Sequence, residues 1–467
     1  CYLRQRQPGP CHCAGGFLNV SAPLLTFYGD DFTGSSAVME VLSFAGIPSM
    51  LFLEVPDEDA LSRYPDLQAI GVAGVARAKA PDWMREHLPP IYEGLKRLGA
   101  PLTHYKVCST FDSAPEIGSI GVATELGAKV FEPAWIPLVV GAPAIGRFQV
   151  FGHLFAAAGD SVYRLDRHPV MSRHPTTPMD EADLCKHLAR QTNMGLAVID
   201  FRSMGAGQSH QTLKTAMAEG AQVVALDAMD DATLAEAGRL IAESGAQFAI
   251  GSQGVEYALV AHWRASGKLA PDHTPPRLAP VEQLFAVSGS CAPTTAAQID
   301  RAAKHGFELL DFDATTVVDE SRLNSEVERL KQTSLRLLSE GCDVLVTTAR
   351  GPDDPAVACM TEAVERAGIS SAGVNARLGM ALGRLVADIR TTTGLSRVAI
   401  GGGDTSGYAL TALEAEALSA VAPLAPGAPL CRVHARRAPK IDGLEVTLKG
   451  GQMGAPDFFI QAKTGGA

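Results

Sequence analysis

Short apolar runs alternate with segments of helical periodicity along most of the chain. After the run at residues 24–27, Val38, Val41 and Ala45 recur at helical spacing, and a second run follows at residues 49–53. Further strands are expected at residues 69–75, 103–107, 138–140, 196–200, 223–226 and 248–250. This alternation predicts an α/β fold with mostly parallel sheets.

Residues 267–281 interrupt the pattern, because they are rich in proline and polar residues and have no apolar period. We predict a linker there. Beyond it, strands are expected at residues 284–287, 309–312, 344–347 and 398–400, with a long helix through 378–389. Because 467 residues exceed what one hydrophobic core usually serves, we predict two α/β domains, at 22–266 and 282–467.

Composition narrows the choice of partners. The chain is 46% hydrophobic and 19% charged, as in an ordinary globular protein, and its net charge of −11 argues against nucleic acid as the main partner. Local Lys and Arg residues can still hold small anions. No apolar stretch is long enough to predict a membrane span.

Cysteine and histidine patterns do not predict a metal site. The nine cysteines occur singly, without a C-x-x-C pair, which is typical of reduced thiols in a cytoplasmic protein. Cys11-His12-Cys13 resembles half of a zinc site without its second half, within residues 1–21 that we expect to be a disordered leader. His168 and His174 lie in the proline-rich segment 164–179, which we expect to be an ordered loop or lid. For these two histidines, anion contact or structural capping is expected rather than metal binding.

Polar and charged residues follow the strands of the first half, and ligands of open α/β sheets bind at the carboxyl ends of strands. The candidates for binding a substrate are Asp30, Asp31, Arg77, Lys106, Cys108, Ser109, Thr110 and Arg147. One of the two aspartates is expected to cap the following helix. Arg and Lys side chains can bind a carboxylate, and Asp and Ser side chains can bind hydroxyls. This combination favours a polyol that carries a carboxylate as the ligand.

Two glycine-rich turns follow strands of the second half. The turn at residues 401–407 offers bare backbone amides at a helix start, which suits phosphate, and the turn at 288–291 repeats the design with Pro293 beyond it. Lys449-Gly450-Gly451 is a weaker third candidate, with Lys449 as a cation near phosphate oxygens.

The glycine turns leave other functions open. There is no P-loop motif, and the 401–407 turn misses the dinucleotide fingerprint by one residue. An NAD-dependent oxidoreductase acting on a small hydroxy acid therefore stays an alternative, as does a non-catalytic sugar-acid sensor. A carboxylate-rich pocket facing a phosphate cradle nevertheless favours a kinase.

Several separated motifs, in order, match a known family. They are Gly29-Asp30-Asp31-Phe32-Thr33-Gly34, Lys106-Val107-Cys108-Ser109-Thr110, the segment with Pro143, Gly146-Arg147 and Gly152, His174-Pro175-Thr176-Thr177-Pro178-Met179, Ser288-Gly289-Ser290-Cys291, and Gly402-Gly403-Asp404-Thr405-Ser406. The chain resembles the four-carbon acid sugar kinase family, whose members phosphorylate threonate, erythronate, 3-oxo-tetronate and related acids with ATP. The resemblance covers nearly all of the chain beyond residue 22.

The resemblance implies that the N-terminal domain at 22–266 binds the substrate, that the C-terminal domain at 282–467 binds the nucleotide, and that the active site lies in the cleft between them. It implies that the strand-end residues of the first half hold the sugar acid, and that ATP is held by Ser288, Ser290, Gly402, Gly403, Asp404, Thr405 and Gly451. Mg²⁺ would bridge the phosphates, largely through water. Arg77 and Lys106 would face the acid group.

For the catalytic base we expect Asp31, or alternatively Asp30, with Asp404 as the next candidate. The particular sugar acid, the hydroxyl and the oligomeric state stay open, a homodimer included.

Overall fold

The structure is a computed structural model that describes residues 22–466 apart from Pro175, and apart from the side chains of Ser371, Ala372 and Asp404. The predicted leader at 1–21, with its Cys-His-Cys motif, lies outside the described residues.

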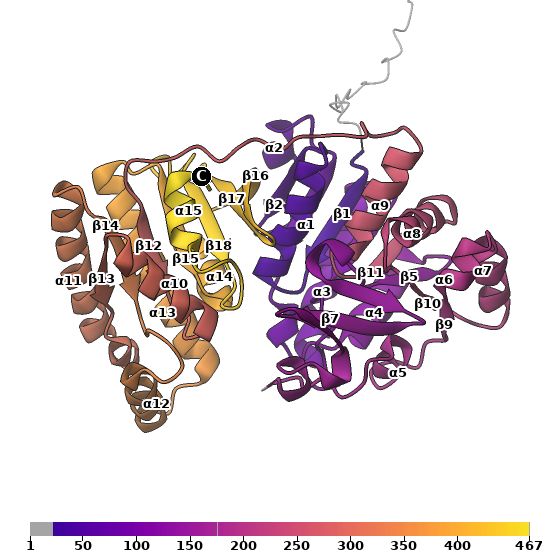
Figure 1. Ribbon diagram of the computed structural model, residues 1–467, viewed down its shortest axis with the longest axis horizontal. Coiled ribbons are helices and arrows are strands. Elements are labelled where there is room, and N and C mark those ends of the chain that lie inside the picture. The colour runs from indigo at the N-terminus through magenta and orange to yellow at the C-terminus, as the bar shows by residue number, and fades with distance from the viewer. Residues whose placement is uncertain (1–21, 175, 467) are drawn as a thin grey trace, which may run out of the picture.

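The described residues form one fifteen-stranded sheet flanked by helices and a separate three-stranded sheet (Figure 1). The first half supplies β1 (Leu25–Gly29), β2 (Ser49–Phe52), β3 (Ala69–Ala73), β4 (Thr103–Lys106), β5 (Ile136–Val139), β9 (Leu196–Ile199), β10 (Val223–Leu226) and β11 (Phe248–Gly251). The small sheet is β6 (Arg147–Val150), β7 (His153–Ala158) and β8 (Ser161–Arg164). The second half supplies β12 (Phe285–Ser288), β13 (Phe307–Asp311), β14 (Asp343–Thr347), β15 (Arg397–Gly401), β16 (Ala417–Ala425), β17 (Ala428–His434) and β18 (Glu445–Lys449). The predicted α/β class is confirmed.

Helices connect most of these strands, as parallel pairing requires. In the first half they are α1 (Phe32–Phe44), α2 (Glu58–Ser62), α3 (Pro81–Arg97), α4 (Ile120–Phe131), α5 (Leu184–Leu188), α6 (Phe201–Gly205), α7 (Ser209–Ala218), α8 (Asp231–Glu243) and α9 (Gly254–Ala265). In the second half they are α10 (Pro293–Lys304), α11 (Glu320–Ser339), α12 (Pro355–Ala367), α13 (Ser371–Thr393), α14 (Gly403–Ala412) and α15 (Phe458–Thr464). Single 3₁₀ turns are η1 (Ala76–Ala78), η2 (Pro143–Ile145), η3 (Leu165–Arg167), η4 (Met171–Arg173) and η5 (Ala314–Val318).

Both halves arrange their first four parallel strands in the same order. In the first half the spatial order is β2-β3-β1-β4, and in the second it is β13-β14-β12-β15. In each half the chain therefore returns to the far side of its first strand when it forms the fourth. The crevice beside that reversal, at the carboxyl ends of the strands, is where open α/β sheets bind ligands.

The two halves share one sheet. Strands β18, β17 and β16 extend the second half, and β16 pairs antiparallel with β2 of the first, at Ala417 with Phe52 and Leu418 with Leu51. One apolar cluster also crosses the junction, since Phe32 and Met39 of α1 belong to the same buried group as Leu418. The described halves are thus joined through backbone hydrogen bonds and a common core.

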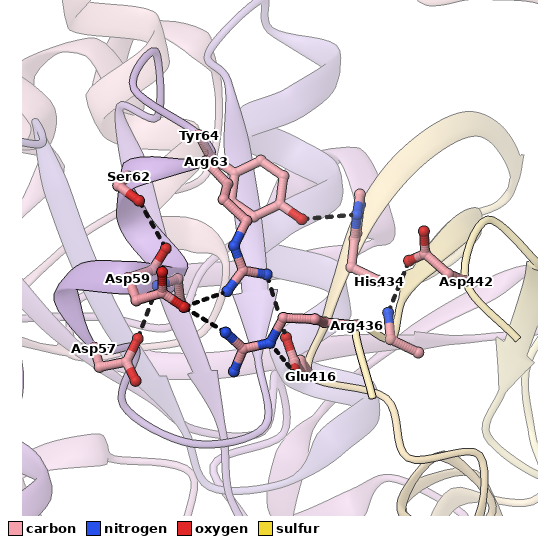
Figure 2. A network of polar contacts seen from close by, with 11 residues as sticks. Asp57, Asp59, Ser62, Arg63, Tyr64, Glu416, His434, Arg436 and Asp442 are labelled. Carbon is pink, nitrogen blue, oxygen red and sulfur yellow. Dashed lines mark hydrogen bonds and ion pairs between the residues drawn. The ribbon is translucent and has the colours of Figure 1, made fainter. Parts of the chain in front are cut away.

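Polar contacts reinforce this junction at the surface (Figure 2). Arg436 forms ion pairs with Asp59 of α2 and, at 3.4 Å, with Glu416. The Tyr64 hydroxyl lies 3.1 Å from Nδ1 of His434. The segment predicted as a linker, 267–281, contains no helix or strand and runs between α9 and β12 along one side of the molecule (Figure 1).

The pattern of the sequence missed two groups of strands. The small sheet of β6, β7 and β8 was not predicted, and neither were β16, β17 and β18. The predicted loop at 164–179 starts at the end of β8 and contains only the turns η3 and η4 as regular structure among its described residues.

Candidate functional site

The first ligand-binding edge begins where β1 ends. Asp31 caps α1, with its Oδ1 accepting a hydrogen bond of 3.0 Å from the backbone N–H of Gly34. Asp30 does not cap; its side chain is 2% exposed and is bound by Arg77, at 2.6 Å from Nη2 and 3.2 Å from Nε. Two adjacent aspartates therefore have two different roles.

Arg77 is neutralised by both carboxylates. Besides its bidentate contact to Asp30, its Nη2 lies 2.8 Å from Oδ1 of Asp31. Burial raises the pKa of Asp30 to about 6, against the opposing charges of Arg77 and Lys106, so the Asp30 carboxylate is ionised at neutral pH. Oδ2 of Asp31 has no hydrogen-bond or ion-pair partner among the residues that the structure describes.

Lys106 brings a buried cation to the same edge from the end of β4. Its side chain is buried, and a β-carbon at Gly34 would lie 2.2 Å from its Nζ, so only glycine leaves room for the ammonium there. The backbone N–H of Asp30 donates to the Lys106 carbonyl at 2.9 Å, which fixes the ends of β1 and β4 side by side.

The residues after β4 form a polar chain beneath this edge. Thr110 donates from Oγ1 to Asp112 at 2.6 Å and lies 2.9 Å from Sγ of Cys108. Burial, followed by the charge of Asp112, raises the pKa of Cys108 to about 11, so its thiol stays protonated. Burial also acts to raise the pKa of Asp112, but Arg77 and the bonds from Cys108 and Thr110 outweigh it and hold that pKa below its usual value. Ser109 is half-buried beside them.

Arg147, at the start of β6, differs from Arg77. Its Nη1 donates only to backbone carbonyls, at 3.2 Å to Gly146 and 3.4 Å to Ala157, and its Nε is buried without a partner among the described residues. It forms no ion pair with a described carboxylate, and burial lowers its pKa. Cys108 lies close enough to act on the pKa of Arg147 in the opposite direction, but burial outweighs it. Arg147 is therefore a cation without an internal counter-ion.

The second edge lies where β12 and β15 end side by side. Ser288 pairs with Gly401, and Gly289 donates to the Gly401 carbonyl at 2.9 Å. Gly402 has a φ of 121°, and a β-carbon on it would lie 2.8 Å from Oγ1 of Thr405. A β-carbon on Gly289 would come within 2.3 Å of the same oxygen. The sequence folds into this turn because these positions are glycine, and the turn places the bare amides of the first turn of α14 at this edge.

A chain of hydrogen bonds connects a buried lysine with the residues beside this turn. Lys449 donates from Nζ to Oγ1 of Thr295 at 2.9 Å, and that hydroxyl lies 3.1 Å from Oγ of Ser290 and 2.9 Å from the Gly451 carbonyl. A β-carbon on Gly451 would lie 2.8 Å from Oγ of Ser290, so these two residues are in close contact. The side chain of Asp404 lies outside the described structure.

The two edges face each other. A β-carbon on Gly403, at the start of α14, would lie 3.9 Å from Oγ1 of Thr33 in the first turn of α1. A β-carbon on Gly450 would lie 3.7 Å from Cγ2 of the same threonine. Glu40 of α1 fixes the arrangement by accepting a hydrogen bond of 2.7 Å from the Gly427 N–H. The amino ends of α1 and α14 thus converge on one space.

Sequence reasoning left the roles of the two loop histidines open. Nδ1 of His168 accepts from the backbone N–H of Met171 at 3.1 Å, and Nδ1 of His174 accepts from that of Thr177 at 3.1 Å. Both cap turns. Among the described residues, no three His, Cys, Asp or Glu side chains are grouped as metal ligands, and no helix is long and apolar enough to cross a membrane.

Two members of this arrangement were not singled out from the sequence. Thr295 links the buried lysine to the cradle, and its one signal was its place just after the 288–291 turn and Pro293. Asp112 follows the predicted strand at 103–107, and nothing in the sequence indicated that it is buried.

Comparisons with known proteins cover both halves. Residues 25–259 match the family described as Sugar-binding N-terminal domain, and residues 285–459 match that described as Nucleotide-binding C-terminal domain. A 3-oxo-isoapionate kinase of Paraburkholderia graminis is 44% identical over 444 residues, which are 95% of this chain and 94% of the relative.

More distant relatives agree over the same length. A 3-oxo-tetronate kinase of Pseudomonas savastanoi pv. phaseolicola is 29% identical over 95% of this chain and 98% of its own. A crystal structure from Salmonella typhimurium LT2 has a TM-score of 0.75 at 22% identity and covers 94% of this chain and 98% of that one. At that identity the likeness shows the fold alone.

Proposed function

Because this chain belongs to the four-carbon acid sugar kinase family, we propose that it is an ATP-dependent phosphotransferase acting on a terminal hydroxyl of a small sugar acid. The observation that carries the proposal is the short approach between Thr33, at the acidic edge of the first half, and Gly403, at the glycine edge of the second. Phosphoryl transfer needs an acceptor and a phosphate held face to face.

The relatives narrow the substrate class. The relative at 44% identity is named for 3-oxo-isoapionate, and relatives at 24% to 29% are named for 3-oxo-tetronate. Both names describe an acid with a 3-oxo group. We therefore propose a 3-oxo sugar acid as the substrate, with 3-oxo-isoapionate as the first to test.

The second edge fits the phosphates of ATP. Gly402 and Gly289 leave no room for a β-carbon, and the amides of Gly403 and Thr405, in the first turn of α14, are open to an anion, whereas the N–H of Gly402 already donates to the Lys449 carbonyl. The residues proposed to hold the nucleotide are Ser288, Ser290, Gly402, Gly403, Asp404, Thr405 and Gly451. Since no described group of three ligands would hold a metal alone, Mg²⁺ is proposed to be bound through phosphate and water.

The acid group of the substrate is proposed to bind Arg147 and Lys106. Arg77, which the sequence also suggested, already has two carboxylate partners. Arg147 and Lys106 form no ion pair with a described residue, so a substrate carboxylate would supply a missing counter-ion.

Asp31 is proposed as the catalytic base. Its Oδ1 is occupied by Gly34 and Arg77, whereas Oδ2 has no partner among the described residues and its side chain is 29% exposed. Oδ2 would accept the proton of the hydroxyl as that oxygen bonds to the transferred phosphorus and the bond to ADP breaks. Asp30 suits the role less, because Arg77 binds both of its oxygens.

An ADP-release assay across 3-oxo, C4 and branched C5 sugar acids tests the proposal. Wild-type protein should release ADP with at least one of them, and Asp31→Asn should lower kcat by about 10² to 10⁴-fold while ATP still binds. Asp57→Asn is the matched control, because Asp57 caps α2 as Asp31 caps α1 but lies at the surface junction of Figure 2.

The outcomes separate the alternatives. Turnover by Asp31→Asn near the wild-type rate would remove the assigned base. NAD binding without ADP release would favour the oxidoreductase alternative, and sugar-acid binding without any turnover would favour the sensor. A homodimer stays a prediction, which light scattering tests.

A further inference from the structure

Lys449 is buried without a counter-ion among the side chains that the structure describes. It is 0% exposed, and its Nζ contacts, of the described residues, the Thr295 hydroxyl at 2.9 Å and the ring of Phe458, whose centroid is 5.9 Å away. No described carboxylate forms an ion pair with it. A buried ammonium without an anionic partner is costly, and an apolar side chain of similar length would normally pack there at lower free energy.

Two contacts connect this lysine with the nucleotide edge. Through its side chain, Lys449 reaches Ser290 and the Gly451 carbonyl by way of Thr295. Through its backbone carbonyl, it accepts a hydrogen bond of 2.8 Å from the N–H of Gly402. The side chain and the backbone carbonyl of Lys449 are thus each linked by hydrogen bonds to the glycine turns of this edge.

We propose that Lys449 is a positioning residue, whose ammonium orients the hydroxyls of Thr295 and Ser290 and adds positive charge near the turn proposed to hold the phosphates. Bound phosphates in turn keep this ammonium protonated. The proposal rests on the nucleotide binding proposed above. It explains why the charge has no internal partner, because the missing anion arrives with the ligand. The same reasoning assigns Thr295 the task of orienting Ser290.

The surroundings of Lys449 give this coupling a pH dependence. Burial lowers the pKa of Lys449 to about 8, and no titratable group on β15, β17, α10, α14 or α15 among the described side chains adds to that shift. Free protein therefore loses the charge as the pH rises through 8. A nearby phosphate favours the ammonium, so the nucleotide complex keeps the charge to higher pH and binding takes up a proton.

The test is calorimetric titration with ADP at pH 7 and pH 9.5, in buffers of different ionisation enthalpy. Wild-type affinity should fall about tenfold between the two values, with uptake of about half a proton per ADP near pH 8.5. Lys449→Met should bind ADP about tenfold more weakly at pH 7, with no such pH dependence. Lys440→Met, an exposed lysine of the same half, is the control and should behave as wild type.

Stability separates positioning from a structural role. Because Lys449→Met removes a buried unpaired charge, the melting temperature of the variant should equal or exceed that of the wild type. If Lys449 instead had a structural role, the variant should melt at a lower temperature. If the variant fails to fold, proton uptake by the wild type still decides. Wild-type ADP binding that is equal at both pH values and takes up no proton overturns the role of Lys449 alone. No ADP binding at either pH overturns it together with the proposed nucleotide site.

Discussion

The two halves build the same strand order and then use it in opposite ways. At the reversal of the first half, Arg77 pairs with the carboxylates of both Asp30 and Asp31. At the reversal of the second half there are bare amides and a buried lysine that has no counter-ion among the described side chains. The first edge is held in place by its own charges, whereas the second lacks an anion until a ligand provides one. Similar topology therefore gives one preorganised edge and one edge that depends on its ligand.

The largest effect is expected from breaking the ion-pair cluster of Asp30, Asp31 and Arg77 in the first half. Arg77→Met leaves the buried carboxylate of Asp30 unpaired, which should lower the free energy of unfolding by about 3–5 kcal/mol in urea titrations. Arg147→Met strands no carboxylate, so it should lower stability by less than about 1 kcal/mol and instead raise the sugar-acid KM at least about tenfold.

A second change separates these arginines further. Asp30→Asn combined with Arg77→Met should recover much of the lost stability, since the stranded charge is gone. Equal destabilisation by Arg77→Met and Arg147→Met would contradict the distinction between a structural and a substrate-binding arginine.

The glycine edge offers a matched pair of smaller effects. Gly402→Ala places a β-carbon against Thr405 at a φ of 121°, so it should cost about 1–3 kcal/mol of stability and weaken ATP binding. Gly403→Ala has space, with its nearest neighbour at 3.9 Å, and should change stability by less than about 0.5 kcal/mol. Thermal melting and ATP titration measure both. Equal melting temperatures for the two variants would mean that the turn is not strained at Gly402.

The smallest effect concerns the contact between the halves. Burial at the junction raises the pKa of Glu40 to about 7, and the hydrogen bond from the Gly427 N–H opposes this shift only in part. A carboxyl with a raised pKa adds stability that is complete below its unfolded pKa and is lost as the pH rises through 7. Between pH 5 and pH 8 wild-type protein should therefore lose about 1–2 kcal/mol relative to Glu40→Gln, measured by urea unfolding.

The exposed Glu58→Gln controls for the change of charge in that experiment. If wild type and Glu40→Gln follow the same pH profile, Glu40 is not buried at the junction in solution.

Much of the fold could be predicted, because the parallel strands have strong local signals. Every strand expected in the first half has a counterpart, from β1 to β11, since most of them are short apolar runs. The strand β16 was missed because it is rich in alanine and contains Pro423, and alanine and proline are depleted in strands. The pairing of β16 with β2 joins residues far apart in sequence, which no local pattern reports.

The candidate residues could be named, but not their states. The rule that ligands bind at strand ends placed Asp30, Asp31 and Arg77 on one edge. It could not predict that Arg77 would form ion pairs with two carboxylates and Arg147 with no described one, because the partners come from different strands. Nor could it predict the burial of Lys449, since lysines are almost never fully buried.

Because β2 pairs with β16, the two halves should stay together even when the chain between them is cut. A protease that cuts within residues 267–281 would break the covalent connection between the two halves. It would leave intact the backbone hydrogen bonds between β2 and β16, the surface ion pairs and the buried side chains that join the two fragments. The nicked protein should stay together through gel filtration and keep its melting transition. Two separately expressed polypeptides, one ending and the other beginning within that segment, should then assemble with each other.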